Sequence, residues 1–286
     1  MSTATVVSAD QKHLANDPLT SPARWATSYA HMLSWELRSM RLILPVGILV
    51  QLLIGAGMAL GFGLLIGDLT ETQALYLSTG VTVIAMITLG IVLVPQVVAQ
   101  QKAEGIYDYI WSLPVPRTAS VAASLTANSA IVIPGAAAAL LVAWLRYDIT
   151  LSLSPIVVPA ALLTILTASS VGMGMAHAIP NPRVTQLITQ VLIFVVLLFS
   201  PINFPAERLP SWLAAIHEGL PFQHAANLMR AGLTDGLATD VGLSFTIMSG
   251  WAVASWLLMA WPRFPISNPI DDRRDSNSTS QGSPTP

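Results

Sequence analysis

The sequence predicts an all-α integral membrane protein with six transmembrane helices, and three observations lead to this prediction. First, 53% of its 286 residues are hydrophobic and 10% are charged, whereas a soluble domain carries about 25% charged residues. Second, the chain holds six apolar runs that reach the roughly 20 residues needed to cross a bilayer. Third, these runs are continuously apolar, which favours helices over the alternating strands of a membrane barrel.

The six runs delimit a membrane domain that we predict over residues 42–261. Polar residues flank it on both sides, so we predict a flexible segment over residues 1–23 and a disordered tail over 262–286, because such segments bury too little apolar surface to fold. The predicted spans are 42–66, 75–99, 119–145, 156–178, 184–204 and 241–261.

The distribution of lysine and arginine predicts the orientation of the chain. If the N-terminus lies inside, the cytoplasmic segments hold all of the 13 Lys and Arg residues except Arg146, Arg208 and Arg230. This is the bias expected of a membrane protein whose positive loops stay inside. Both termini are therefore predicted to be cytoplasmic, and so is the segment over residues 100–118.

Residues 24–41 have the pattern of an amphipathic helix that lies on the inner leaflet. Apolar side chains fall on one side of a helical wheel and polar ones on the other. Glu36 breaks the pattern because it falls on the apolar side. It either snorkels or pairs with a nearby arginine, or it docks against the cytoplasmic segment 100–118.

Two polar segments between the spans are predicted to be structured. Residues 100–118 are polar and rich in aromatic residues, and they join the second and third spans where a cytoplasmic ATPase can reach them. Residues 205–233 are too apolar for a free outer loop and too interrupted by proline for two full spans. We expect two short helices there, about 207–219 and 222–233, which dip back into the outer leaflet and are shielded by protein.

Several kinds of chemistry are absent from the sequence. There is no cysteine and no GxxxxGK[ST] phosphate loop, so a thiolate site and ATP binding through a Walker A motif are excluded. A net charge of −2 gives no reason to expect a nucleic-acid partner. No His, Asp or Glu is spaced to form a metal or hydrolase site with His177, so no metal and no cofactor is expected on this chain.

Polar residues within the spans are candidates for a substrate path. The alternative for each of them is a hydrogen bond between helices, which contributes about 0.6 kcal/mol on average. All acidic residues lie outside the six runs, which disfavours an ion-coupled carrier. The candidate path residues are Gln51, Thr82, Thr88, Gln186 and Gln190.

Two motifs together resemble those of type-2 ABC transporter permeases, the transmembrane subunits of drug, lipid and polysaccharide exporters. The stretch KAEGIYDYIWSLPVPR over residues 102–117 resembles the pattern E-G-T-hydrophobic … L-P-x-x-R that follows the second span in that family. The stretch FSPINFPAERLPSW over 199–212, followed by LPF and LMR, is similar to the motif after the fifth span. Ile106 departs from the pattern, because the family often has Thr there. The resemblance covers nearly the whole chain.

The resemblance implies roles for the residues of both motifs. The segment after the second span is implied to be a coupling helix that docks into a groove of a separate ATPase through Lys102, Glu104, Gly105, Tyr107, Asp108 and Arg117. The outer segment is implied to form re-entrant helices that gate release. The residues of this gate are Pro201, Phe204, Pro205, Glu207, Leu209, Pro210, Pro221 and Arg230.

The function implied is that of an exporter permease without enzymatic activity of its own. Two copies of an ATPase would carry ATP and Mg, and a second permease, the same or a homologous chain, would complete the pathway between the first, second and fifth spans. The pathway is apolar with scattered amides and hydroxyls, which suits an amphipathic or hydrophobic small molecule or lipid. By analogy the protein is expected in a bacterial inner membrane. The alternatives are a secondary transporter, an intramembrane lipid enzyme and a non-transporting scaffold or sensor.

Overall fold

The computed structural model describes residues 21–42, 44–66 and 69–260, and all regular structure in these ranges is helical. Six helical segments are long and apolar enough to cross a membrane, which confirms the predicted fold class. The predicted flexible N-terminus, apart from its last three residues, and the predicted tail lie outside the described residues. The spans are α3 (Leu44–Ile66), α4 to α5 (Glu71–Ala103), α7 (Arg117–Tyr147), α8 (Val157–Ala178), α9 (Pro182–Phe199) and α12 (Val241–Ala260).

The second span is the central helix of the bundle and the most buried one. It runs through α4 (Glu71–Thr88), a π-helical turn η1 (Leu89–Leu93) and α5 (Val94–Ala103). Pro95 has no N–H for the hydrogen bond to the carbonyl four residues earlier, and a π turn accommodates such a break in the ladder. Gly90 in this turn packs against α8, where an added Cβ would lie 2.5 Å from the carbonyl carbon of Ala168. The second span covers Glu71–Ala103 and is therefore longer than the apolar run 75–99 that predicted it.

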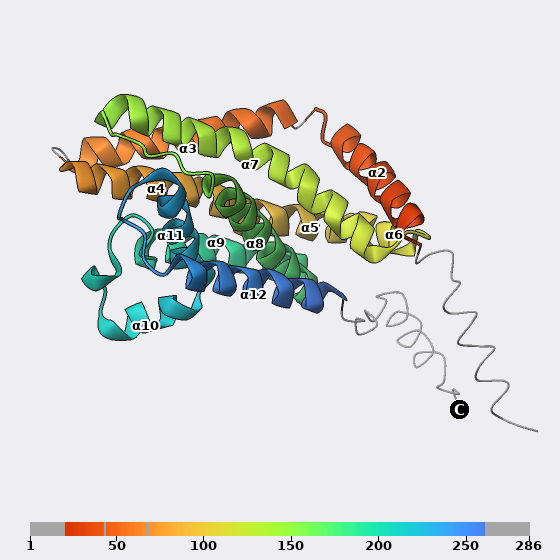
Figure 1. Ribbon diagram of the computed structural model, residues 1–286. Coiled ribbons are helices and arrows are strands. Elements are labelled where there is room, and N and C mark those ends of the chain that lie inside the picture. Colours follow the sequence, from red (N-terminus) through yellow and green to blue (C-terminus); the bar gives the residue numbers. More distant parts are fainter. Residues whose placement is uncertain (1–20, 43, 67–68, 261–286) are drawn as a thin grey trace, which may run out of the picture.

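Helix α2 (Pro22–Ser39) precedes the first span and packs against the start of α7. Its N-terminus is capped by Ser21, whose hydroxyl accepts the N–H of Arg24 at 3.3 Å. The indole of Trp25 donates to Thr118 at 3.0 Å, and the hydroxyl of Tyr29 donates to Thr126 at 3.1 Å. The amphipathic helix is therefore present close to its expected limits, and Figure 1 shows it at the same end of the molecule as α6.

A short helix, α6 (Ile106–Ser112), connects α5 to α7. The chain turns between α5 and α6 at Gly105, whose φ of 74° lies in the left-handed region that glycine adopts without strain. The segment between the second and third spans is thus compact and helical.

The outer segment contains three helical pieces at the opposite end of the bundle from α6 (Figure 1). They are η2 (Ala206–Arg208), α10 (Ser211–Gly219) and α11 (Pro221–Leu233). Helix α11 is largely buried and contacts α4, α8 and α12, whereas α10 is mostly exposed. Gly232 allows close packing there, because an added Cβ would lie 2.5 Å from Cα of Val157.

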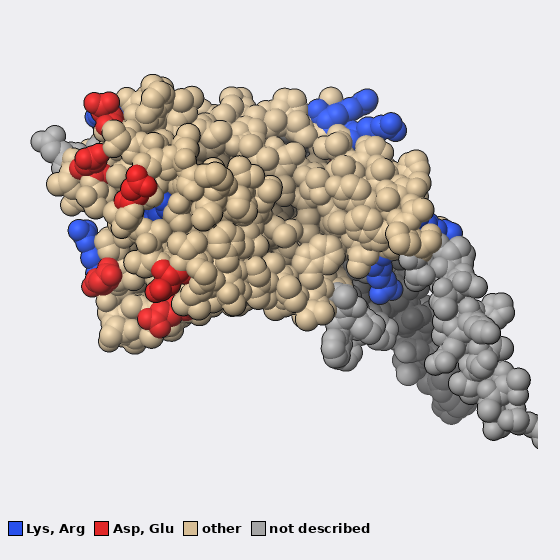
Figure 2. All heavy atoms as spheres, viewed as in Figure 1, with Lys and Arg blue, Asp and Glu red and all other residues tan. Residues whose placement is uncertain are grey.

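Charge is separated along the long axis of the bundle. Figure 2 shows Lys and Arg gathered mainly at the end that carries α2 and α6, and Asp and Glu gathered at the end that carries α10 and α11. The surface between these two ends is almost free of charge in this view. This is the distribution expected of a protein whose middle faces lipid.

Candidate functional site

The segment between the second and third spans presents two different faces. Lys102 and Tyr107 point into the bundle: the Lys102 ammonium donates to the carbonyls of Ala176 at 2.5 Å and Ile179 at 2.8 Å. The Tyr107 hydroxyl lies 2.5 Å from Nδ1 of His177. These contacts hold α5 and α6 against the C-terminal end of α8, where a cation is also favoured by the helix dipole.

The other predicted docking residues lie on the outward face of the same segment. Glu104, Gly105, Asp108 and Arg117 are all exposed. Tyr109, which the sequence reasoning did not single out, is 62% exposed on this face. Residues two apart on a helix point in different directions, so a tyrosine at both 107 and 109 was the sequence signal that one of them would be exposed. The structure thus divides the six predicted residues into two that face the bundle and four that face solvent.

Glu36 of α2 is buried, with 2% of its surface exposed. It accepts a hydrogen bond from the hydroxyl of Ser124 on α7, and no ion pair joins it to another described residue. Glu36 therefore neither snorkels nor pairs with an arginine, because α7 supplies a polar partner within the helix packing. Burial raises the pKa of the Glu36 carboxyl above its usual value of 4.5, and the hydrogen bond from Ser124 opposes this in part.

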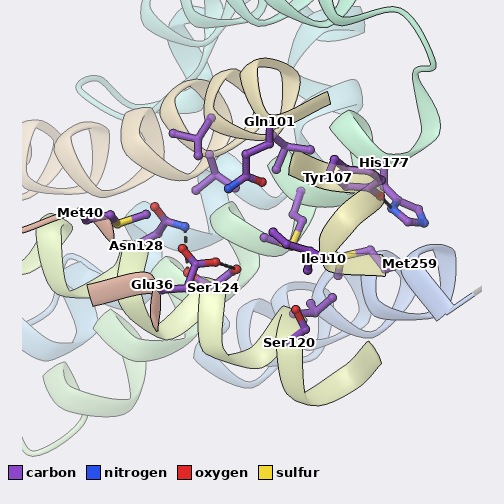
Figure 3. A pocket seen from close by; sticks show the side chains of 15 residues that line it. Glu36, Met40, Gln101, Tyr107, Ile110, Ser120, Ser124, Asn128, His177 and Met259 are labelled. Carbon is purple, nitrogen blue, oxygen red and sulfur yellow. Dashed lines mark hydrogen bonds between the residues drawn. The ribbon is translucent and has the colours of Figure 1, made fainter. Parts of the chain in front are cut away.

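A small cavity separates Glu36 from α6. Figure 3 shows Glu36, Ser124 and Asn128 on one side of it and Tyr107 with His177 on the other. The cavity encloses about 50 Å³, whereas binding sites for drug-sized ligands are about 300 Å³ or larger. This cavity has room for a few waters. Gln101, Tyr107 and Ile110 of the segment 100–118 line it together with Glu36, so Glu36 lies close to that segment.

A larger cavity, called the outer cavity after the predicted orientation, opens at the end of the bundle opposite α6, between the chain after α9, helix α11 and the start of α12. It has a volume of about 510 Å³. Of the eight residues of the predicted gate, those that line it are Pro201, Phe204, Pro205, Glu207 and Arg230. The other three have positions that shape the local backbone: Leu209 and Pro210 precede α10, and Pro221 is the first residue of α11, a position that proline favours.

Arg230 is the most buried charged residue of the outer cavity, with 4% of its surface exposed. One of its terminal nitrogens, Nη2, donates to the carbonyl of Ile202. The guanidinium lies 4.1 Å from the ring centroid of Tyr76, an arrangement typical of a cation–π contact. The outer segment is therefore tied to α4 and to the chain after α9 through this one side chain.

The five candidates for a substrate path do not come together. Gln51 and Thr82 are buried in the bundle, where Gln51 donates to the carbonyl of Ala85 at 3.2 Å and Thr82 to that of Ser78 at 2.9 Å. Thr88 is half-buried beside the π turn. Gln186 and Gln190 are exposed, one turn apart on α9. A role in transport stays a prediction for all five residues.

In the described part of the chain there is no group of three or more His, Cys, Asp or Glu residues that could hold a metal ion. The candidate sites that remain are the exposed face of the segment 100–118 and the outer cavity. The outward face of the segment 100–118 is suited to a protein partner, and the outer cavity is suited to a small ligand.

Six packed spans with a structured segment at one end and a cavity at the other are the features of a multi-pass membrane protein. Over residues 27–234, more than half of its length, the chain matches the family described as ABC-2 type transporter. It belongs to that family, whose members are transmembrane components of ABC transporters. A search of curated proteins finds no match to the chain.

Proposed function

We propose that this chain is the permease subunit of an ATP-driven exporter that moves an amphipathic or hydrophobic substrate outward. Membership of the family supports a permease role. The sequence has no Walker A motif, so ATP and Mg would be bound by a separate ATPase. Two ATPase subunits would act on two permeases, the second being the same or a homologous chain.

The observation that carries this proposal is the outward face of the segment 100–118. Glu104 and Asp108 are exposed, four residues apart, on either side of a left-handed turn at Gly105. Two carboxylates and an exposed Tyr109 form a compact projection that suits a partner surface with basic and apolar groups. Gly105 faces open space at this projection, because nothing lies within 4 Å of an added Cβ there.

The inward face of the same segment explains how a docked partner would move the bundle. Lys102 and Tyr107 connect the projection to the C-terminal end of α8 through hydrogen bonds to Ala176, Ile179 and His177. A displacement of α6 would therefore displace α5 and α8 together. Closure of an ATPase dimer would be converted in this way into rigid-body movement of the helices.

The proposed orientation places α2, α6 and both termini in the cytoplasm, in the inner membrane of a bacterium. The charge separation in Figure 2 supports it, because the basic end carries the projection. The outer cavity then faces the exterior, where the gate would release substrate.

Co-purification tests the proposal. The chain is isolated in mild detergent and the proteins bound to it are identified by mass spectrometry, in the wild type and in Glu104→Arg. We expect a stoichiometric Walker A ATPase with the wild type and its loss in the variant, because the charge reversal opposes a basic partner surface. Glu218→Arg, a charge reversal of an exposed residue on α10, is the control and should retain the ATPase.

An isolated wild-type chain without any ATPase would contradict the proposal. A secondary transporter or a scaffold would then describe the protein better. A permease that co-purifies with an ATPase whose activity no substrate stimulates would favour a sensor.

A further inference from the structure

The outer cavity has the dimensions of a ligand site. Its volume of about 510 Å³ falls within the range of roughly 300–1,000 Å³ typical of small-molecule sites. Helix α12 contributes the apolar side chains of Leu243 and Ile247 to its wall, beside the hydroxyl of Ser244. Leu243 is 55% exposed on the flank of the bundle. An apolar chain can therefore leave the cavity along α12.

The charge of Arg230 is not matched by a carboxylate. Among the described residues, no acidic side chain lies within ion-pair distance of the Arg230 guanidinium, and its Nε is buried without a hydrogen-bond partner. The Ile202 carbonyl and the Tyr76 ring are neutral partners. An unpaired buried charge is costly, and buried charges in proteins are normally paired.

The acidic residues of the cavity lie apart from Arg230. Glu207, Glu218 and Asp240 line the cavity but are exposed, so their charges are screened by solvent. Gln223 lines the same cavity two helical turns before Arg230 on α11, and its Oε1 is also buried without a partner. Because the two ends of an amide are assigned by their partners, Gln223 can present an N–H to a ligand. A deep cation and an unpartnered amide thus share one cavity.

We propose that this cavity binds the anionic group, a phosphate or a carboxylate, of an amphiphile, with Arg230 as its counter-charge. The apolar tail runs along Leu243 and Ile247 of α12. Guanidinium groups bind such anions strongly through charge-assisted hydrogen bonds. The inference rests on the proposed function for its role in transport, where it narrows the substrate to anionic amphiphiles, although the binding itself needs no ATPase.

Binding of labelled dodecyl phosphate tests the inference. The purified full-length chain is placed in phosphatidylcholine nanodiscs, and dodecyltrimethylammonium serves as a cationic probe with the same tail. We expect saturable binding of dodecyl phosphate at least tenfold tighter than that of the cation. Arg230→Gln should weaken dodecyl phosphate binding at least tenfold. Arg208→Gln, which removes an exposed arginine nearby, is the control and should change it less than twofold.

A second variant keeps the test decisive if Arg230→Gln fails to fold. Gln223→Glu has nearly the same shape and brings a carboxylate into the cavity. We expect it to weaken dodecyl phosphate binding at least tenfold, because the added carboxylate repels the anionic group of the ligand. Equal binding of the anionic and cationic probes, or unchanged anion binding in both Arg230→Gln and Gln223→Glu, would overturn the inference.

Two further arms identify the source of the anion and separate this inference from the proposed function. Phosphatidylglycerol nanodiscs that suppress dodecyl phosphate binding identify a membrane lipid as the occupant, whereas unchanged binding identifies another amphiphile, and both results agree with an anion site. Loss of the ATPase in co-purification leaves the binding result intact. Absence of anion binding, in turn, leaves the ATPase interaction intact.

Discussion

At the scale of single residues, the buried acid of α2 shows how burial decides chemistry. Glu36 is a buried carboxyl that accepts a hydrogen bond from the hydroxyl of Ser124, beside a cavity lined by both apolar and polar side chains. Its pKa is raised because desolvation outweighs that hydrogen bond. The protonated form is therefore favoured by folding, and we expect the stability that Glu36 contributes to depend on pH.

The pH dependence of stability tests this assignment. A raised pKa in the folded state means that the native protein binds more protons than the unfolded chain between the two pKa values. The stabilisation is complete below the unfolded value of 4.5 and is lost as the pH rises through the folded value. Thermal unfolding in detergent should show this decline for the wild type, and Glu36→Gln should flatten it. An identical pH profile in both proteins would contradict the assignment.

The left-handed turn at Gly105 provides a second prediction for a single residue. Gly105→Ala should destabilise the protein by about 1–2 kcal/mol, because an L side chain is strained at a φ of 74°. Denaturant unfolding followed by circular dichroism measures the change. Gly57→Ala is the control, since Gly57 lies within α3 with nothing within 4 Å of an added Cβ, and it should keep or raise stability. Equal effects of the two substitutions would contradict the turn assignment.

At the scale of elements, the contact of α5 and α6 with α8 combines an apolar cluster of Val98, Tyr107 and Ala176 with specific polar contacts. Lys102 donates to two carbonyls at the end of α8, and the Tyr107 hydroxyl meets His177. The carbonyls at a helix C-terminus lack partners within the helix. Lys102 of α5 therefore supplies hydrogen-bond donors to carbonyls at the C-terminal end of α8.

Lys102→Met separates this bracing role from a docking role. Loss of charge-assisted hydrogen bonds, each contributing about 1.5–3 kcal/mol, should lower the unfolding temperature of the isolated chain measurably. Glu104→Gln, an exposed neighbour whose side chain only accepts from Gln100 at 2.8 Å, is the control and should leave it nearly unchanged. A Lys102→Met protein with wild-type stability but weakened ATPase binding would show that Lys102 acts in docking instead.

The elements were predictable from the sequence to a greater extent than the directions of their side chains. Long apolar runs define spans because a bilayer has a fixed thickness. Short helices begin at or next to Gly105, Pro210 and Pro221, which can be read from the sequence. Contacts between distant elements left no such local signal. The sequence reasoning therefore grouped Lys102 with Glu104, although they face opposite ways, and it did not find Ser124 as the partner of Glu36.

At the scale of the whole molecule, the two ends differ in charge and in structure. The basic end carries α2 and the projection at α6, and the acidic end carries α10, α11 and the large cavity. The apolar surface of α3, α9 and α12 lies between them. In the function that we propose, the basic end binds a cytoplasmic partner and the acidic end binds a ligand.

Cysteine labelling tests the polarity, and the absence of native cysteine makes it simple. Asp108→Cys and Glu218→Cys replace exposed residues at opposite ends of the bundle. A membrane-impermeant maleimide added to intact cells should label position 218, and it should label position 108 only after the cells are broken. The reverse pattern would invert the orientation.

The most direct measurement of the central claim is photo-crosslinking from the proposed docking face. A benzophenone amino acid replaces Tyr109, which is 62% exposed on α6, or Trp212, which is 65% exposed on α10 at the other end. The two side chains are exposed to a similar extent, and they probe opposite ends of the molecule. The account predicts a cross-link to a Walker A ATPase from position 109 and none from position 212. An ATPase cross-link from position 212 alone, or from neither position in a complex that hydrolyses ATP, would contradict it.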